Sequence, residues 1–362
     1  MTVHVVGAGM AGLSAAFTLT KAGVPVVVHE SAARAGGRCC SFFDKRLNAL
    51  IDAGTHLMLG ANTALLAMLT ECPTRTPLKN VGTKMLFFRK DGTRFDIDTA
   101  RPLSAAAHLP ELYPLLCESV MNTPARQADA VMFLKTAIKC FGAKNGAVYL
   151  ADPSLHDSVV APVEQYLKQR SVVFRFGRRL RRVRENRLIF FDGEEIELSN
   201  GDKAILAVSP DGLSRLIVGA PEFPHQTIVN LHYKTAAAMP APFFGMVGMT
   251  GHWGFAKNGI VSVTISAAND LTARYSADAL AGLVWHDLAR ILKTDEVAPP
   301  FRTVLEKRAT ILQTRAVNRS RLSQNIGSDT VFIAGDATAT ALPCTIEGAV
   351  RSGIAAARAA LN

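Results

Sequence analysis

The sequence predicts an α/β fold in which a parallel nucleotide-binding sheet carries an inserted second domain of mixed α and β structure. Three observations predict it. An apolar run over residues 3–6, a glycine-rich turn with a helical segment over 11–21, and a second apolar run over 24–29 form a β–α–β unit. A strand–glycine–helix pattern returns at residues 331–353. Helical sequence over 104–150 and β-rich sequence over 172–208 lie between them.

The first glycine-rich turn has the spacing of a dinucleotide-binding loop. Gly7 permits a tight turn, Gly9 lets a pyrophosphate approach the backbone, and Gly12 allows close packing of helix on strand. The start of the helix supplies free N–H groups for the phosphates. Glu30 follows the second strand and is expected to accept hydrogen bonds from ribose hydroxyls. The loop alone does not separate NAD from FAD.

The remaining elements follow in order. Residues 104–150 are expected to be helical but interrupted at Pro110, Pro114 and Pro124. Strands are expected at 226–234 and 260–267, and a helix over 276–292. The strand at 331–335 is expected to return beside the N-terminal strand. The nucleotide-binding domain would then comprise 1–78, 151–218 and 318–362, and the inserted domain 79–150 and 219–317.

Composition excludes several classes of protein. With 49% hydrophobic and 19% charged residues in 362, the chain can bury a large core and is not disordered. Its six cysteines form neither a CxxC pair nor a Cys/His cluster, so no metal site is expected. We recognise no signal peptide and no apolar run of about 18 residues, so a cytoplasmic location is expected.

The net charge of +10 is concentrated in residues 168–187, which hold nine Lys or Arg and one Glu. This basic strip is explained either by a charged edge strand that resists aggregation or by contact with an anionic membrane surface. A nucleic-acid site is not expected, because neither a recognition helix nor an aromatic stacking platform accompanies the arginines.

The segment after Glu30 carries a resemblance to a known family. The run Arg34-Ala35-Gly36-Gly37-Arg38 resembles the motif of the flavin-dependent amine oxidase and carotenoid desaturase superfamily. The resemblance implies FAD in a Rossmann-like domain of a GR2-type flavoprotein, with Arg34, Gly36, Gly37 and Arg38 in the cofactor site. Arg38 would lie near the FAD phosphates, and the two glycines would let the chain pass close by. It also implies that Leu180, in the run RRLRRV, lies against the adenine.

Four further stretches, 50–62, 121–134, 252–267 and 335–353, resemble the squalene-associated FAD-dependent desaturase group. Its characterised members are hydroxysqualene dehydroxylases of bacterial hopanoid synthesis. The resemblance implies reduction of hydroxysqualene to squalene by reduced FAD. The chain departs from the group in lacking a helical portion over 70–110 and in having Ala337 where tryptophan is usual. An FAD-dependent isoprenoid desaturase, an amine oxidase and a non-catalytic lipid carrier stay open as alternatives.

The reaction needs an acid to assist departure of the hydroxyl group. His56 and His252 are the candidate catalytic residues, and a flavin-bound water is a third candidate. Asp52 would share a strand face with His56. A wall for a long isoprenoid is expected from an aromatic-rich stretch, with Asn122 at the mouth of the tunnel. The expected wall residues are Phe243, Phe244, Met246, Trp253 and Phe255.

A water-insoluble substrate has to come from a bilayer. The protein is therefore expected to be peripheral, on an anionic membrane surface at the inner face of the bacterial plasma membrane. Residues 104–141 and the basic strip are the two candidate contacts. No motif points to a particular electron donor.

The C-terminal pattern is expected to complete the cofactor site rather than to form a second one. The resemblance implies that Asp336, after Gly335, bonds to the ribitol of FAD. The helix beginning at Thr345, Ile346 and Glu347 would direct its free N–H groups at the pyrimidine edge of the flavin. That placement would favour negative charge on the reduced ring.

Overall fold

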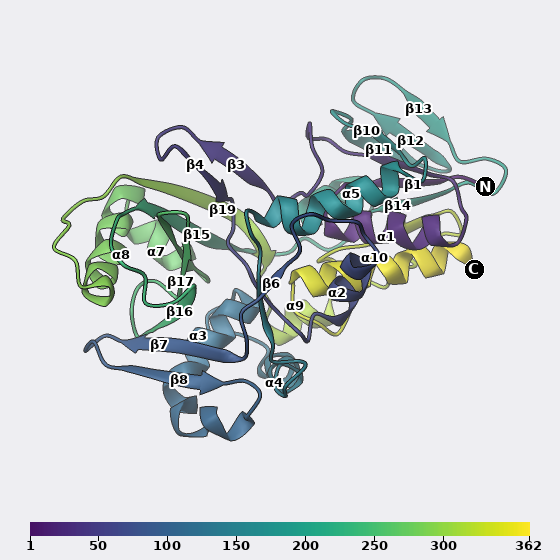
Figure 1. Cartoon of the computed structure of the whole chain (residues 1–362). Coiled ribbons are helices and arrows are strands. Elements are labelled where there is room, and N and C mark those ends of the chain that lie inside the picture. Colours follow the sequence, from purple (N-terminus) through teal and green to yellow (C-terminus); the bar gives the residue numbers. More distant parts are fainter.

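The computed structural model describes all 362 residues, and one lobe is built on a five-stranded parallel sheet (Figure 1). The strand order is β10-β2-β1-β14-β20. β1 is buried along its whole length, as expected for a parallel strand covered on both faces. The strands are β1 (Val3–Val6), β2 (Val26–His29), β10 (Val173–Arg175), β14 (Lys203–Leu206) and β20 (Val331–Ile333).

The C-terminal strand does return to this sheet, but the expectation that it lies beside the N-terminal strand is wrong. β14 pairs with β1 on one side and with β20 on the other. β14, which comes from the middle of the chain, pairs with the edge of β1 that β2 leaves free. It therefore lies between β1 and β20.

The helices that flank the parallel sheet bring the two ends of the chain together (Figure 1). α1 and α10 lie side by side at Gly353, where an added Cβ would be 2.0 Å from the carbonyl oxygen of Ala11. Only glycine allows this approach. The helices of this lobe are α1 (Met10–Lys21), α2 (Thr63–Thr70), α5 (Ala161–Lys168) preceded by the π-helical turn η2 (His156–Val160), α6 (Pro210–Leu216), α9 (Arg315–Arg319) and α10 (Ile346–Leu361).

A three-stranded antiparallel sheet links β10 to β14 and contains four of the nine basic residues of the basic strip: Arg181, Arg182, Arg184 and Arg187. Its strands are β11 (Leu180–Arg184), β12 (Arg187–Phe190) and β13 (Glu195–Glu197). Much of the charge is balanced locally: Arg178 pairs with Asp192 and Glu194, at 2.9 and 2.6 Å, and Arg187 approaches Glu195 at 3.5 Å. Residues 164–197 together contain nine basic and six acidic side chains.

The second lobe is built on a seven-stranded sheet in the order β19-β15-β18-β17-β16-β7-β8. One face packs on α8 (Ala277–Leu292), the other on α3 (Leu109–Met121). The strands are β7 (Lys84–Arg89), β8 (Arg94–Asp98), β15 (His225–Lys234), β16 (Phe243–Val247), β17 (Trp253–Lys257), β18 (Ile260–Ile265) and β19 (Phe301–Ile311), and α7 (Asn269–Arg274) precedes α8.

The prolines of the helical segment interrupt it less than expected. α3 runs through Pro114, so the expected break there is wrong. Pro110 lies in the first turn, where no N–H is needed, and both prolines are exposed, so water can serve the carbonyl that Pro114 leaves unbonded. The segment contains the 3-10 helix η1 (Pro102–His108), α3 and α4 (Ala130–Lys139). Between α2 and α3 there is no α-helix.

The five parallel strands lie within 1–78, 151–218 and 318–362, and the seven-stranded sheet lies within 79–150 and 219–317. A small sheet crosses these limits, because β5 (Leu57–Leu59) pairs with β9 (Val148–Leu150), which also pairs with β6 (Lys79–Asn80). The domain limits therefore stay a proposal. A hairpin of β3 (Ser41–Asp44) and β4 (Ala49–Asp52) completes the fold.

Candidate functional site

The glycine-rich loop between β1 and α1 has one side closed by protein and one side open. Gly7 has φ +106°, and a Cβ there would lie 2.3 Å from the carbonyl oxygen of Ala207. A Cβ on Gly12 would lie 1.8 Å from the carbonyl oxygen of Gly7. A Cβ on Gly9 would meet no protein atom within 4 Å. The space beside Gly9, at the start of α1, is therefore where a phosphate can reach the free N–H groups.

Glu30 is buried beside this loop and holds it in place. Its carboxylate accepts hydrogen bonds from the backbone N–H groups of Ala8 at 2.7 Å and Ala32 at 2.8 Å. The charge at the end of β2 therefore lies directly against the first turn of the loop. Its contact with a ribose stays a prediction.

The double-glycine segment lies against the first loop. Gly36 has φ +113°, Gly37 has φ +56°, and a Cβ on Gly37 would lie 3.3 Å from the Cα of Gly9. The two arginines of the motif differ. Exposed Arg34 donates to the carbonyl oxygen of Ser41 at 2.9 Å. Arg38 forms an ion pair with Asp336 at 2.6 Å and also donates to the carbonyl oxygen of Ala309. Arg38 thus joins the N-terminal motif to the C-terminal one.

The C-terminal motif faces the same region. Asp336 is buried, and its carboxylate raises the pKa of Arg38. Thr345 caps α10, because its hydroxyl oxygen accepts the N–H of Gly348 at 3.2 Å. The backbone N–H groups of Ile346 and Glu347 belong to the first turn, where the helix offers them no carbonyl. These free N–H groups could serve an anionic ring edge.

The side chain of Glu347 has another task. Its carboxylate accepts the backbone N–H groups of Ala64 and Leu65, both at 3.0 Å, and pairs with Arg351 at 2.7 Å. It therefore caps the start of α2 and ties this helix to α10. Only the backbone of Glu347 is free for a cofactor.

These elements fit an extended dinucleotide. The open space at Gly9 and the starts of α1 and α10 offer free backbone N–H groups that suit anionic groups, and the Arg38–Asp336 pair connects the two motifs. No cluster of three or more His, Cys, Asp or Glu side chains could hold a metal ion.

Comparison with known proteins identifies the cofactor class. The family model of flavin containing amine oxidoreductases matches residues 10–145 and 253–361. The chain belongs to this family. Membership makes it a flavin-dependent oxidoreductase and confirms the expected FAD and the expected fold class.

Relatives within the family cover the whole chain. The hydroxysqualene dehydroxylase of Zymomonas mobilis is 33% identical over 422 aligned positions, with 99% of each chain covered. That of Sinorhizobium fredii is 30% identical, with 99% of this chain and 98% of the relative covered. The structure of cyclohexylamine oxidase from Brevibacterium oxydans has a TM-score of 0.71 at 14% identity, covers 99% of this chain and 98% of its own, and shows the shared fold. These relatives confirm the resemblance to the squalene-associated group.

His56 lies between β4 and β5, so the expectation that it shares a strand face with Asp52 is wrong. The first strand ends at Asp52 and the next begins at Leu57. Asp52 instead accepts the hydroxyl of Ser41 at 2.6 Å. His56 hydrogen-bonds through Nδ1 to the carbonyl oxygen of Gly54 at 2.7 Å, and burial lowers the pKa of its imidazole.

His252 has an acidic neighbour that the sequence did not reveal. Its Nε2 lies 3.5 Å from a carboxylate oxygen of Glu118 on α3, and its Nδ1 accepts the N–H of Ser266 at 3.2 Å. Burial lowers the pKa of His252 to about 4, so desolvation outweighs the distant carboxylate. Burial also raises the pKa of Glu118. The pair therefore contains a neutral imidazole and a carboxyl group that holds its proton more tightly than usual.

The expected apolar wall is divided between two faces of the seven-stranded sheet, so its treatment as a single wall is wrong. Phe244 and Met246 pack toward α8 in one core cluster. Phe243, Trp253 and Phe255 pack toward α3 in another. Successive side chains of a strand alternate between faces, which separates them. The α3 side also carries Glu118, so Phe243, Trp253 and Phe255 remain candidates for a substrate wall.

Asn122 is buried at the end of α3 and its amide is fully occupied by protein. It accepts the N–H of Ala267 at 2.7 Å and donates to Thr310 at 3.0 Å. Gln313, which the sequence analysis did not select, joins the same helix end to the cofactor region. Its side chain donates to the carbonyl oxygen of Met121 and accepts the N–H of Cys344 at 2.8 Å, just before α10.

Leu180 and Ala337 both lie in the hydrophobic core at the ends of the central strands. Leu180 is buried in a core cluster with Val6 and Leu206, at the ends of the central strands. Its contact with adenine stays a prediction. Ala337 is buried in the same cluster, so the residue that replaces the usual tryptophan faces the core below the Asp336 loop.

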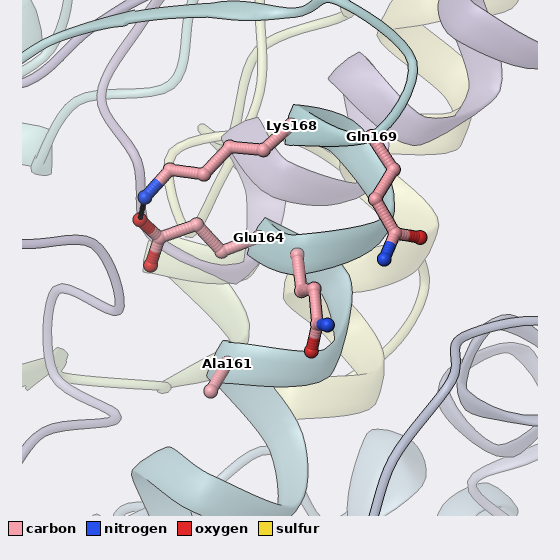
Figure 2. A pocket seen from close by; sticks show the side chains of 5 residues that line it. Ala161, Glu164, Lys168 and Gln169 are labelled. Atoms are coloured by element: carbon pink, nitrogen blue, oxygen red, sulfur yellow. Dashed lines mark ion pairs between the residues drawn. The ribbon is translucent and has the colours of Figure 1, made fainter.

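A surface depression on α5 lies apart from this site (Figure 2). It is lined by Ala161, Glu164, Gln165, Lys168 and Gln169. Glu164 and Lys168 form an ion pair at 2.6 Å across one helical turn, so each charge is neutralised by the other. Neither the glycine loop nor the α10 start contributes to this depression.

Proposed function

We propose that the chain reduces hydroxysqualene to squalene and that Glu118, with His252, supplies the proton. The observation that carries the first part is the match to hydroxysqualene dehydroxylases over nearly the full length of both chains. The reaction breaks one C–O bond, releases water and forms one C–H bond. When bound, reduced FAD supplies the hydride and is oxidised.

The residues of the chain have three tasks in this reaction. Phe243, Trp253 and Phe255 exclude water from the reacting carbon, since an allylic cation would otherwise be trapped by water, and their ring faces stabilise positive charge. Because its pKa is raised, Glu118 keeps its proton to a higher pH than an ordinary carboxyl group, and His252 lies near enough to orient it. His56 remains a second candidate for the acid.

An anaerobic single-turnover assay tests the reaction. With photoreduced FAD in the enzyme, we expect hydroxysqualene to give squalene with about one flavin oxidised per squalene formed. Flavin absorbance and extracted product are measured together. Oxidised enzyme with the same substrate is the control. Dehydrogenation of isoprenoids or amines by oxidised enzyme, without squalene from reduced enzyme, would instead establish a desaturase or oxidase.

The pH dependence of this assay tests the acid. Because the carboxyl must be protonated to donate, the single-turnover rate is expected to be high below the raised pKa of Glu118 and to fall as the pH rises through it. Glu118→Gln keeps the shape of the side chain but holds no acidic proton, so we expect the rate to fall at least about tenfold and this pH limb to vanish. His56→Gln is the matched variant. A pH limb that survives in Glu118→Gln and disappears in His56→Gln would assign the acid to His56.

The proposed substrate is a lipid, so we also propose that the protein works at a membrane surface. No helix combines the length and apolar character needed to cross a bilayer. A peripheral contact is the arrangement that an apolar substrate then requires.

A further inference from the structure

α4 exposes a row of apolar side chains that no part of the chain covers. Val131, Leu134 and Ile138 are 52%, 58% and 64% exposed. Their spacing of three and four residues places them on one side of the helix. The opposite side is anchored, because Phe133 is buried against Cys117 and Met121 of α3. We call Val131, Leu134 and Ile138 the α4 face.

The charges around the α4 face have one sign. Lys135 and Lys139 are exposed, lie one helical turn apart and border the apolar row. Arg126 is exposed just before the helix. The acidic residue of this segment, Asp129, is buried as the N-cap, where it accepts the N–H of Met132 at 3.2 Å. The surface that α4 offers is therefore apolar with a basic border.

The elements next to α4 in sequence, η1 and α3, also expose apolar side chains. Leu109 and Tyr113 of α3 are 53% and 39% exposed, and Leu103 of η1 is 87% exposed. The ring of Tyr113 contacts that of Phe133 edge-on, with centroids 5.6 Å apart, so α3 and α4 meet here. Such a concentration of apolar surface marks an interaction site.

The α4 face lies beside the candidate functional site. The backbone carbonyl of Gln313 accepts the N–H of Asp129, the N-cap of α4, at 3.0 Å. The side chain of Gln313 reaches Cys344, immediately before Thr345 and α10. The N-terminal end of α4 is therefore linked to the start of α10 through Gln313.

We propose that the α4 face inserts into the boundary between headgroups and acyl chains of an anionic bilayer. This rests on the proposed function, which requires a lipid substrate. The basic border complements anionic headgroups, whereas two copies meeting through this face would bring lysines together. The basic strip is the weaker candidate: it lies at the opposite end of the molecule (Figure 1), and its charges are partly paired. Of the two contacts expected from the sequence, residues 104–141 and the basic strip, the proposal therefore favours the first and narrows it to α4.

Sedimentation of the full-length FAD-loaded protein with vesicles tests the assignment. We use vesicles of phosphatidylglycerol and phosphatidylcholine, or of phosphatidylcholine alone. Leu134→Ser/Ile138→Ser is expected to weaken binding to the mixed vesicles at least about tenfold. Val218→Ser/Val297→Ser removes two other exposed apolar side chains and is expected to bind as the parent does. Flavin absorbance confirms that each variant is folded.

Turnover of detergent-dispersed hydroxysqualene separates docking from catalysis. We expect Leu134→Ser/Ile138→Ser to retain the parent rate there, because the bilayer step is bypassed. A parent protein without turnover but with α4-dependent vesicle binding would refute the proposed function and leave the docking site standing. Unchanged vesicle binding in this variant, with loss in Arg181→Gln/Arg184→Gln, would overturn the proposal in favour of the basic strip. A change of oligomeric state in gel filtration would overturn it in favour of a contact between copies.

Discussion

Replacing Gly9 with valine is expected to weaken FAD binding strongly while leaving the apoprotein folded. A Cβ at this position meets no protein atom within 4 Å, and the φ of −73° suits any residue. The side chain would occupy the space that a pyrophosphate needs to reach the loop. We expect the affinity for FAD to fall on the order of 100-fold, equivalent to about 2.7 kcal/mol. Titration of the apoprotein with FAD, followed by flavin fluorescence, measures it.

Gly12→Ala is the matched variant, because its methyl group would meet protein instead of cofactor. The Cβ would lie 1.8 Å from the carbonyl oxygen of Gly7, so α1 has to move away from β1. We expect the free energy of unfolding to fall by about 3 kcal/mol, against no more than about 1 kcal/mol for the lost glycine N-cap in Gly9→Val. Equal FAD affinity in Gly9→Val and the parent would contradict the placement of the phosphate.

The glycine loop was predictable because its information is local. Gly7, Gly9 and Gly12 are close in sequence, and each requirement follows from the turn and helix that they start. The same holds for the strands around the basic strip and for α8, which follow from periodicity and turn residues. The order of the sheet was less accessible, because the pairing of β14 with both β1 and β20 joins segments that are far apart in the chain.

The parts of the site that sequence reasoning missed depend on long-range contacts. Glu118 on α3 meets His252, which precedes β17, and Gln313 joins three segments; no local pattern marks either residue. The division of the aromatic wall did have a signal, since strand alternation already separates Phe243 from Phe244. The ion-pair partner of Arg38 is Asp336, which belongs to the C-terminal motif that the sequence already indicates. Only the structure shows that the two side chains pair.

Removing the positive charge of Arg38 is expected to weaken both the fold and the cofactor site. The carboxylate of Asp336 is buried and depends on Arg38 at 2.6 Å, so Arg38→Met leaves a buried charge without its cation. Because the Arg38 side chain is 46% exposed, water offsets part of this loss. We expect the free energy of unfolding to fall by about 2–3 kcal/mol, less than for a fully buried pair. Urea unfolding of the apoprotein measures it.

A double-mutant cycle isolates the Arg38–Asp336 interaction from other effects of either change. In Arg38→Met/Asp336→Asn the unpaired charge is gone, so the double variant is expected to be more stable than the sum of the single losses by at least about 1 kcal/mol. Arg34→Met is the control, because Arg34 is exposed and bonds only to the carbonyl of Ser41. Its expected loss is within about 0.5 kcal/mol. FAD titration of the same variants should show at least about tenfold weaker binding for Arg38→Met, since the pair joins the two motifs that we expect to hold one cofactor. Strictly additive losses, or equal FAD affinity in Arg38→Met and Arg34→Met, would mean that the two motifs act independently.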